Sequence, residues 1–191
     1  MMAKNPGAHV ADFLFDKHNC DMLDNVRPVK WTDPEADPAL VYDMVVIGGG
    51  AGGLVTAVGS SIYGAKACMI ERSLIGGDCL VSGCVPSKAF LKACNVAHTV
   101  KTCSEFGVEI TGEVKINFKA LMDRMKKIRA DISNHDAAKN WTDEYGLDIY
   151  MGHAKFASRD TVEINGSTLR FAKACIATGG RPHIPDYPGI Q

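Results

Sequence analysis

Residues 42–53 read Tyr42-Asp43-Met44-Val45-Val46-Ile47-Gly48-Gly49-Gly50-Ala51-Gly52-Gly53, a short apolar run that ends in a cluster of glycines. Such a run predicts a strand that is buried on both faces, as in a parallel sheet. The stretch 54–63 is compatible with a helix, and residues 66–71 form a second apolar run. The order strand, turn, helix, strand predicts a βαβ unit and therefore an α/β fold with a parallel sheet.

The glycines follow the pattern Gly48-x-Gly50-x-x-Gly53, which is typical of a dinucleotide-binding turn. Gly48 would permit the tight turn, Gly50 the close approach of a phosphate, and Gly53 the packing of helix on strand. Glu71 ends the second strand and is expected to accept hydrogen bonds from ribose hydroxyls, which disfavours NADP at this site. These residues leave FAD and NAD both open, and a purely structural glycine turn is the alternative.

A second motif, residues 77–88, holds two cysteines that are separated by four residues. A regular helix would put residues i and i+5 roughly 8–9 Å apart, whereas a disulfide needs Cα atoms within about 7 Å. The pair can therefore close only where the backbone departs from a regular helix, and Gly83 provides that freedom. Pro86 suits the first position of a helix, so Cys79 and Cys84 would lie near a positive helix end that favours a thiolate. The motif predicts a redox pair.

Two other interpretations of these cysteines stay open. Cys94 and His98 lie one helical turn apart and could join Cys79 and Cys84 in a zinc site. Against zinc, the loop between the two cysteines is longer than most C-x2-C knuckles. The remaining alternative is a set of thiols without special chemistry.

The segment Gly77-x-Cys79-x4-Cys84-Val85-Pro86-Ser87-Lys88 resembles the active-site segment of the pyridine nucleotide-disulfide oxidoreductases. These are FAD enzymes that include dihydrolipoamide dehydrogenase, glutathione reductase and mercuric reductase. Of these branches, the sequence as a whole most resembles the mercuric reductase-like enzymes. Asp78 stands where the family usually has Thr, and Val81 where Asn is usual. The resemblance favours FAD at the glycine turn. It implies a Rossmann-like FAD-binding domain with a parallel sheet, a long helix and a β-hairpin or meander.

The resemblance also implies which residues bind FAD and which react. Cys79 and Cys84 would form the redox disulfide, with Cys84 nearer the flavin and Cys79 meeting the substrate. Lys88 would lie near the flavin N5 edge, where a positive charge stabilises an electron-rich ring. No metal ligand is expected. The expected FAD-binding residues are Gly48, Gly50, Ala51, Gly52, Gly53, Glu71, Arg72, Gly77, Asp78, Cys79, Lys88, Gly152, Ala154, Ala177, Thr178 and Gly179.

The second half of the chain has its own local signals. Asn117 is expected to cap a long helix whose apolar residues recur from 118 to 132. Two short runs, 161–164 and 167–171, flank Asn165-Gly166 and predict a hairpin with a type I′ turn. Residues 172–177 predict a further strand, which would deliver the expected flavin contacts at its end.

Composition limits the function classes. The 191 residues are 46% hydrophobic with a formal net charge of −1, which gives no electrostatic case for binding nucleic acid. Seven cysteines at irregular spacing do not suggest a secreted disulfide framework, so a reducing compartment, cytoplasmic or organellar, is expected. Residues 44–65 carry no charge, but their glycines favour a strand, turn and helix over a membrane span, and no membrane partner is expected.

The chain divides by composition into residues 1–40, predicted to be a partly ordered arm, and 41–191, the FAD-binding domain. An apolar patch at 10–15 is too short and too acidic for a signal peptide. The resemblance implies further nicotinamide and interface domains, so we expect the front part, inactive alone, of a longer homodimeric enzyme. The complete enzyme would pass electrons from NAD(P)H to a small-molecule substrate. The alternatives are a non-catalytic flavin or nucleotide module and a zinc-binding structural domain.

Overall fold

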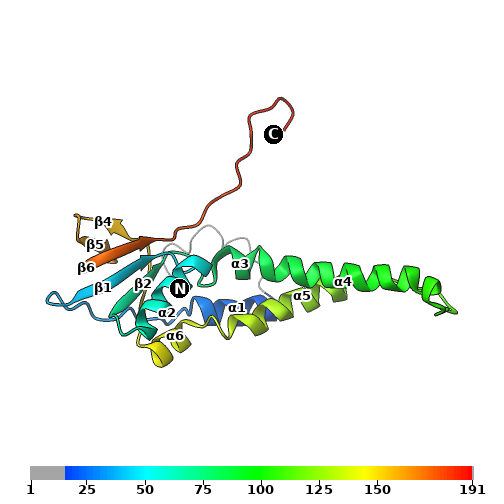
Figure 1. Cartoon of the computed structure of the whole chain (residues 1–191), viewed down its shortest axis with the longest axis horizontal. Helices are drawn as coiled ribbons and strands as arrows, with labels where there is room; N and C mark the ends of the chain where they lie inside the picture. Colours follow the sequence, from blue (N-terminus) through cyan, green and yellow to red (C-terminus); the bar gives the residue numbers. More distant parts are fainter. Residues whose placement is uncertain (1–15, 191) are drawn as a thin grey trace.

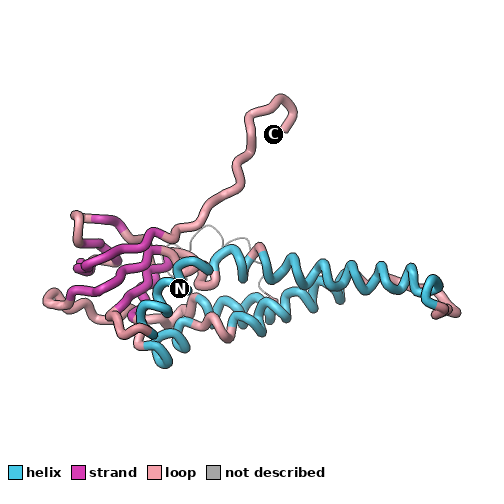
Figure 2. The backbone as a smooth tube through the Cα atoms, in the orientation of Figure 1, coloured by secondary structure: helices cyan, strands magenta, loops and turns pink. Residues whose placement is uncertain are grey.

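The computed structural model describes residues 16–190, so the apolar patch at 10–15 and Gln191 lie outside it. A mixed sheet carries helices, and an extended tail of residues 177–190 runs away from the sheet (Figures 1 and 2). The elements are α1 (Lys17–Val26), β1 (Val41–Ile47), α2 (Ala51–Ile62), β2 (Ala67–Glu71), α3 (Gly77–Val81), α4 (Cys84–Thr102), η1 (Cys103–Phe106), α5 (Phe118–Ser133), α6 (Ala138–Tyr145), β3 (Asp148–Met151), β4 (Lys155–Phe156), β5 (Thr161–Ile164) and β6 (Ser167–Ile176).

Within residues 16–190 the strands form one six-stranded sheet in the order β3-β2-β1-β6-β5-β4. β1 pairs in parallel with both β2 and β6, and β2 pairs in parallel with β3. β6, β5 and β4 are antiparallel neighbours. The α/β prediction is therefore confirmed, with a mostly parallel sheet that turns antiparallel at one side.

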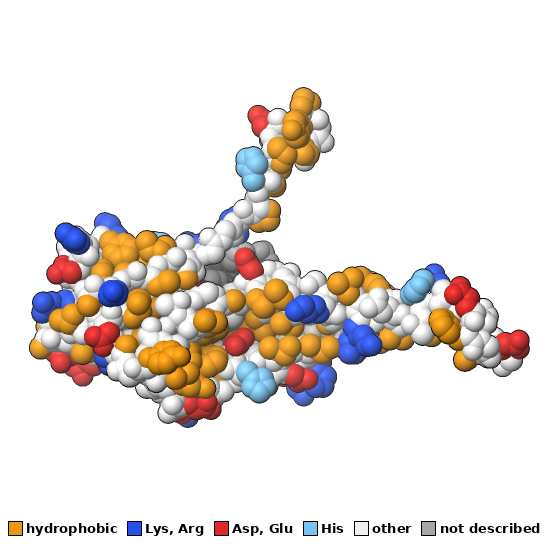
Figure 3. Space-filling view, in the orientation of Figure 1, with side chains coloured by type: hydrophobic (Ala, Val, Ile, Leu, Met, Phe, Trp, Pro, Cys, Tyr) orange, Lys and Arg blue, Asp and Glu red, His pale blue; other side chains and the backbone are white. Residues whose placement is uncertain are grey.

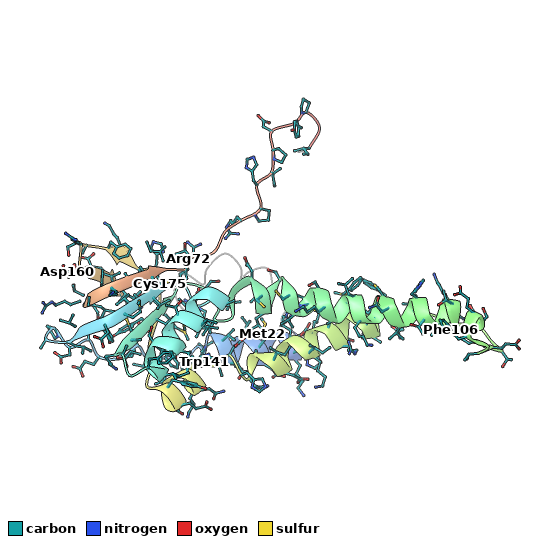
Figure 4. The ribbon with its side chains drawn as sticks, in the orientation of Figure 1. Met22, Arg72, Phe106, Trp141, Asp160 and Cys175 are labelled. Carbon is teal, nitrogen blue, oxygen red and sulfur yellow. The ribbon has the colours of Figure 1, made fainter. Side chains whose placement is uncertain are left out.

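Successive residues of the central strands point to opposite faces of the sheet, and both faces are buried. Val46 and Met69 belong to a core that α1, α2 and α5 cover, together with Met22 of α1 (Figure 4). Val45 and Cys68 face the other way, into a second core with Phe171 and other residues of β5 and β6. Burial on both faces explains why β1 and β2 are apolar throughout and do not alternate with polar residues.

Helices α4 and α5 run side by side away from the sheet and form a long finger, residues 84–133 (Figure 1). The predicted cap is confirmed, because the Asn117 side chain accepts a hydrogen bond of 3.0 Å from the Ala120 N–H. Phe90 and Phe118 meet edge to face across the two helices, with ring centroids 6.3 Å apart. The finger is thus held by contacts between its own helices.

Some expectations need correction. α4 begins at Cys84, so Pro86 occupies its third position, where a missing N–H also costs nothing. Residues 167–176 form one continuous strand because its first part pairs with β5 and its second part, from Arg170 to Ile176, pairs with β1. The hairpin itself is confirmed, with positive φ at Asn165 and Gly166 as a type I′ turn requires.

Neither α1, which lies inside the predicted arm, nor α6 was predicted from the sequence. Residues 44–65 form the end of β1, the glycine turn and α2 rather than one helix. Of the helices in the described part of the chain, none combines the length and apolarity that crossing a membrane requires.

Candidate functional site

The glycine turn connects β1 to α2 at the carboxyl end of the parallel strands. Gly48 has φ +110°, and a Cβ there would lie 2.2 Å from the carbonyl oxygen of Ala177. A Cβ on Gly53 would lie 1.7 Å from the Gly48 carbonyl oxygen, so this residue packs helix on strand as predicted. Gly50 caps α2 without a side chain, which leaves the N–H groups of the helix N-terminus accessible to an anion.

Glu71 ties the glycine turn to the second strand. Its Oε2 accepts a hydrogen bond of 2.6 Å from the Gly49 N–H, and its Oε1 accepts one of 2.5 Å from the Ser73 N–H. Only 8% of the residue is exposed. Because each oxygen of the carboxylate accepts one backbone N–H, its orientation is fixed. Its remaining lone pairs can accept hydrogen bonds from ribose hydroxyls.

The cysteine loop packs directly on the glycine turn. Gly77 has φ +55°, and a Cβ there would lie 2.8 Å from the Cα of Gly50. The Gly76 N–H donates to the Gly49 carbonyl at 2.8 Å. Because two glycine backbones meet without side chains, the loop that carries Cys79 starts beside the helix N-terminus.

A cleft of about 770 Å³ opens between these segments. Arg72, at its rim, lies where the C-terminal tail leaves the sheet (Figure 4). In open α/β sheets ligands bind outside the carboxyl ends of the strands, which is where this cleft lies. The predicted residues that line it are Gly48, Gly50, Glu71, Arg72, Gly77, Asp78, Gly152, Ala154, Ala177, Thr178 and Gly179.

Other predicted residues lie outside the cleft wall. Ala51, Gly52 and Gly53 belong to the first turn of α2 and do not line the cleft. Lys88 is exposed on α4, one turn beyond Cys84. Cys79 is not itself part of the wall, although its α3 neighbours Asp78 and Val81 are.

The helix breaks between the two cysteines, as their spacing requires. α3 ends at Val81 and α4 starts at Cys84, with Gly83 at φ −107° and ψ −108° between them. A Cβ on Gly83 would lie 2.8 Å from the Asp78 carbonyl oxygen, so the break needs a glycine. Both cysteines are free thiols, Cys79 partly buried and Cys84 exposed.

The electrostatics of Cys79 differ from the expectation of a favoured thiolate. Its hydrogen bond with the Cys84 thiol, followed by burial, raises the pKa of Cys79 above that of an ordinary thiol. The charge of Asp136 adds to this rise in pKa, whereas the Lys88 ammonium opposes it. In this state of the pair, the Cys84 thiol and burial favour the neutral form of Cys79.

The structure places His135 and Asp136 in the turn after α5, with Asp136 packed against Gly76 at the start of the cysteine loop. Burial raises the pKa of Asp136, and the neighbouring His135 lowers it. No local sequence signal indicates this contact.

The four residues of the zinc hypothesis do not come together. Cys94 is exposed in the middle of α4, and His98 follows it along that helix. Across residues 16–190 the structure has no group of three or more His, Cys, Asp or Glu side chains arranged to hold a metal ion. The zinc interpretation therefore has no geometric support in the described part of the chain.

Several residues of the site were missed in sequence. Gly49 and Ser73 hold the Glu71 carboxylate through their backbone N–H groups, which any residue type supplies. His153 lies between two predicted residues of the wall, and Arg181 follows Gly179 and Gly180 in the tail. A signal existed only for these last two, namely their proximity to predicted positions.

The comparison with known families agrees with this geometry. Residues 42–191 match the family described as pyridine nucleotide-disulphide oxidoreductase. The chain belongs to this family. The match begins at β1 and includes the glycine turn, the cysteine loop and every wall residue of the cleft.

Individual relatives carry several names. The chain is 36% identical over 153 residues to a dihydrolipoyl dehydrogenase of Acholeplasma laidlawii, covering 78% of this chain and 44% of the relative. It is 36% identical over 150 residues to a mercuric reductase of Lysinibacillus sphaericus, covering 78% and 27%. A glutathione reductase of Nostoc is 29% identical over 150 residues, covering 78% and 32%. The chain thus spans less than half the length of these curated relatives.

The residues present fit the FAD that the family implies. The glycine turn leaves no Cβ where a pyrophosphate would approach α2, and Glu71 is fixed at the end of β2. The cleft volume lies within the usual range for a cofactor site. An extended dinucleotide could therefore lie with its pyrophosphate at Gly50 and its adenosine toward Glu71.

Proposed function

We propose that this chain is the FAD-binding part of an oxidoreductase that passes electrons from NAD(P)H to a redox pair formed by Cys79 and Cys84. One observation carries the proposal. The cleft with dinucleotide features is bordered on one side by α3, so Asp78 and Val81 of its wall flank Cys79. The Cys79 thiol thus lies within one helical turn of the proposed cofactor site.

The chain's own residues would hold the cofactor and tune the sulfurs. Glu71 would accept the ribose hydroxyls, and the N-terminus of α2 would face the pyrophosphate. Bound FAD would supply electron transfer between NAD(P)H and the cysteine pair. The pair would cycle between a disulfide and two thiols, taking up two electrons and two protons. Lys88, which opposes the rise in the pKa of Cys79, would favour the attacking thiolate.

The finer form of the proposal concerns the complete enzyme. We propose a mercuric reductase-like role in a homodimer located in a reducing compartment, with a small-molecule acceptor. The identity to the mercuric reductase of Lysinibacillus sphaericus supports it, and the equal identity to a dihydrolipoyl dehydrogenase names its competitor. Supplying the NAD(P)H-reduced full-length enzyme with either mercuric ion or lipoamide would decide between the two acceptors.

The redox pair can be tested without a substrate. The FAD-loaded full chain is titrated anaerobically with dithionite, and we expect it to take up one electron pair beyond the pair that reduces the flavin. Cys79→Ser should abolish the extra uptake because no disulfide can form. Cys94→Ser, at an exposed thiol on α4, is the matched control and should retain it.

Each other result has a defined meaning. Bound FAD without extra electron uptake would indicate a non-catalytic flavin module. Stoichiometric zinc that is lost in Cys79→Ser would indicate a zinc-binding structural domain. Failure of the chain to bind FAD at all would overturn the proposed site.

A further inference from the structure

Residues 16–33 precede the part of the chain that matches the family, residues 42–191, yet they contact the walls of the cleft. We name this segment the strap. It consists of α1 and the extended stretch that follows it. The contacts of the strap fall into three groups: with α5, with the loop after Glu71, and with the edge strand β3.

The first group fixes α1 firmly. Met22 and Val26 are fully buried in the same core as the helix-side residues of β1 and β2. Lys126 of α5 forms an ion pair of 2.6 Å with Asp16, at the N-terminus of α1. Asn25 donates a hydrogen bond of 2.9 Å to Ser133. The strap is therefore an integral element of the domain core.

The second group lies on the loop that follows Glu71. Arg27 donates a hydrogen bond of 2.6 Å from Nη1 to the Ser73 carbonyl oxygen. The N–H of the same Ser73 holds Oε1 of Glu71, and the Ile75 N–H donates to the Val26 carbonyl at 3.3 Å. Arg27 thus binds the carbonyl group of Ser73, while the N–H group of Ser73 orients the Glu71 carboxylate.

Charge reinforces this contact. Burial lowers the pKa of Arg27, whereas the nearby charges of Glu71 and Asp33 raise it, so a cation lies within electrostatic reach of the Glu71 carboxylate. Glu71 is almost fully buried, and a buried carboxylate is stabilised by hydrogen bonds and by a nearby positive charge. Both oxygens of a carboxylate accept, so Glu71 has lone pairs for hydrogen bonds from both ribose hydroxyls.

The third group covers β3, which is the edge strand of the sheet. Trp31 donates from Nε1 to the Ile149 carbonyl at 3.2 Å, and Asp33 accepts from the Met151 N–H at 2.8 Å. Gly152 follows directly, donates to the Glu71 carbonyl at 2.9 Å and lines the cleft. The strap therefore binds β3 directly before Gly152, which lines the proposed adenosine end of the cleft.

We propose that the strap sets the adenosine end of the cofactor site, with Arg27 as the positioning residue for Glu71. This inference rests on the proposed function, because it takes the ligand to be FAD. The strap contacts at Ser73 and at β3 lie beside Glu71 and Gly152, so the expected effect of the strap is on cofactor affinity. The strap should affect the affinity of every ligand that contains an adenosine diphosphate group.

The test compares Arg27→Ala, Arg27→Lys and the matched control Lys30→Ala, which removes an exposed cation near the C-terminal end of the strap. Affinities of the flavin-free full chain for FAD and for ADP are measured, together with the urea midpoint. We expect Arg27→Ala to weaken both ligands about tenfold. Arg27→Lys should restore most of the loss, to within about threefold of the parent, and Lys30→Ala should change nothing.

A merely structural contact would lower the urea midpoint of Arg27→Ala and leave both affinities of the folded protein unchanged, which would overturn the proposal. If Arg27→Ala does not fold, Arg27→Met carries the test, since it keeps an unbranched side chain but has neither charge nor N–H donors. Full parental affinity in that variant would then overturn it. If the parent chain binds neither FAD nor ADP, the proposed function fails and not the role of the strap alone.

Discussion

In the core that β5 and β6 help to form, two buried side chains have raised pKa values. Tyr42 donates a hydrogen bond of 2.8 Å to Asp148, which Lys66 pairs at 2.6 Å. Cys68 lies in the same core, fully buried. Burial and the nearby Asp148 charge raise the pKa of the Cys68 thiol and of the Tyr42 hydroxyl. Both groups are therefore held in their neutral forms.

This predicts a loss of stability at alkaline pH. The raised pKa of Cys68 means that the folded state binds this proton more tightly than the unfolded state does. Its contribution is complete below the unfolded thiol pKa of about 8.5 and is lost as the pH rises above that value, by up to about 1.4 kcal/mol per pH unit. The urea midpoint should fall between pH 8 and 10.5.

Cys68→Ala should reduce this fall, because the variant has no buried thiol to ionise. Cys94→Ala, at an exposed cysteine, is its control and should keep the parental pH profile. Identical profiles for the two variants would exclude Cys68 as the source of the fall.

Among the elements, those with local signals could be predicted from sequence. The apolar run before Gly48, the acid at Glu71 and the Asn165-Gly166 turn are each read within a few residues, and the structure contains the corresponding strand, strand end and hairpin. The break between α3 and α4 could also be predicted, because a disulfide between Cys79 and Cys84 excludes a regular helix and Gly83 allows a non-helical backbone.

The elements that were missed depend on distant partners. α1 is short and polar on most positions, and its buried residues Met22 and Val26 make sense only against α5. The same limit applies to the site: the contact between Arg27 and Ser73 joins residues that no local pattern connects. Residue identity predicts what a side chain can do, whereas only the fold determines which neighbour it meets.

The N-terminus of α1 offers a test at this scale. The Asp16 carboxylate caps the helix through the Asn19 N–H at 2.9 Å and also pairs with Lys126. Asp16→Ala should lower the free energy of unfolding by about 1–2 kcal/mol. Asp16→Asn should lower the free energy of unfolding by less, about 1 kcal/mol or below. Asparagine keeps the cap and loses only the ion pair with Lys126. Asp21→Ala, at an exposed position of α1, is the control.

The effect of Asp16→Ala should depend on pH. Although burial opposes it, Lys126 and the Asn19 N–H lower the pKa of Asp16. A lowered carboxyl pKa stabilises the fold above the unfolded value of about 3.9 and loses this effect as the pH falls further. The parent and Asp16→Ala should therefore converge in urea midpoint in acid, and a constant difference would contradict the assignment.

In the whole molecule, the end of the finger is exposed to solvent. Its end carries apolar side chains such as Phe106, Val108 and Ile116, and all of residues 107–117 are exposed (Figures 3 and 4). That stretch forms no helix or strand and joins η1 to α5. Such a segment opens locally at little cost, unlike the sheet.

Limited trypsin treatment should therefore cut first after Lys115, which is the basic residue of this stretch. The two fragments should stay together in gel filtration because α4 and α5 pack on each other and on the remaining domain. Lys115→Gln should abolish the early cut. Arg181 precedes a proline and provides an internal control that trypsin leaves intact. Early cleavage after Lys155, within the sheet, would contradict this order of stability.

The strap has a consequence for how the protein is made. Its contacts span 110 residues to Lys126 and 132 residues to Asn165. A ribosome adds about 5–20 residues per second, so Met22 and Val26 wait some 5–20 s before α5 exists to cover them. Ordering such distant pairs also slows folding through the entropy of loop closure. The strap can therefore dock only after α5 has been made, and its apolar side chains stay accessible to chaperones until then.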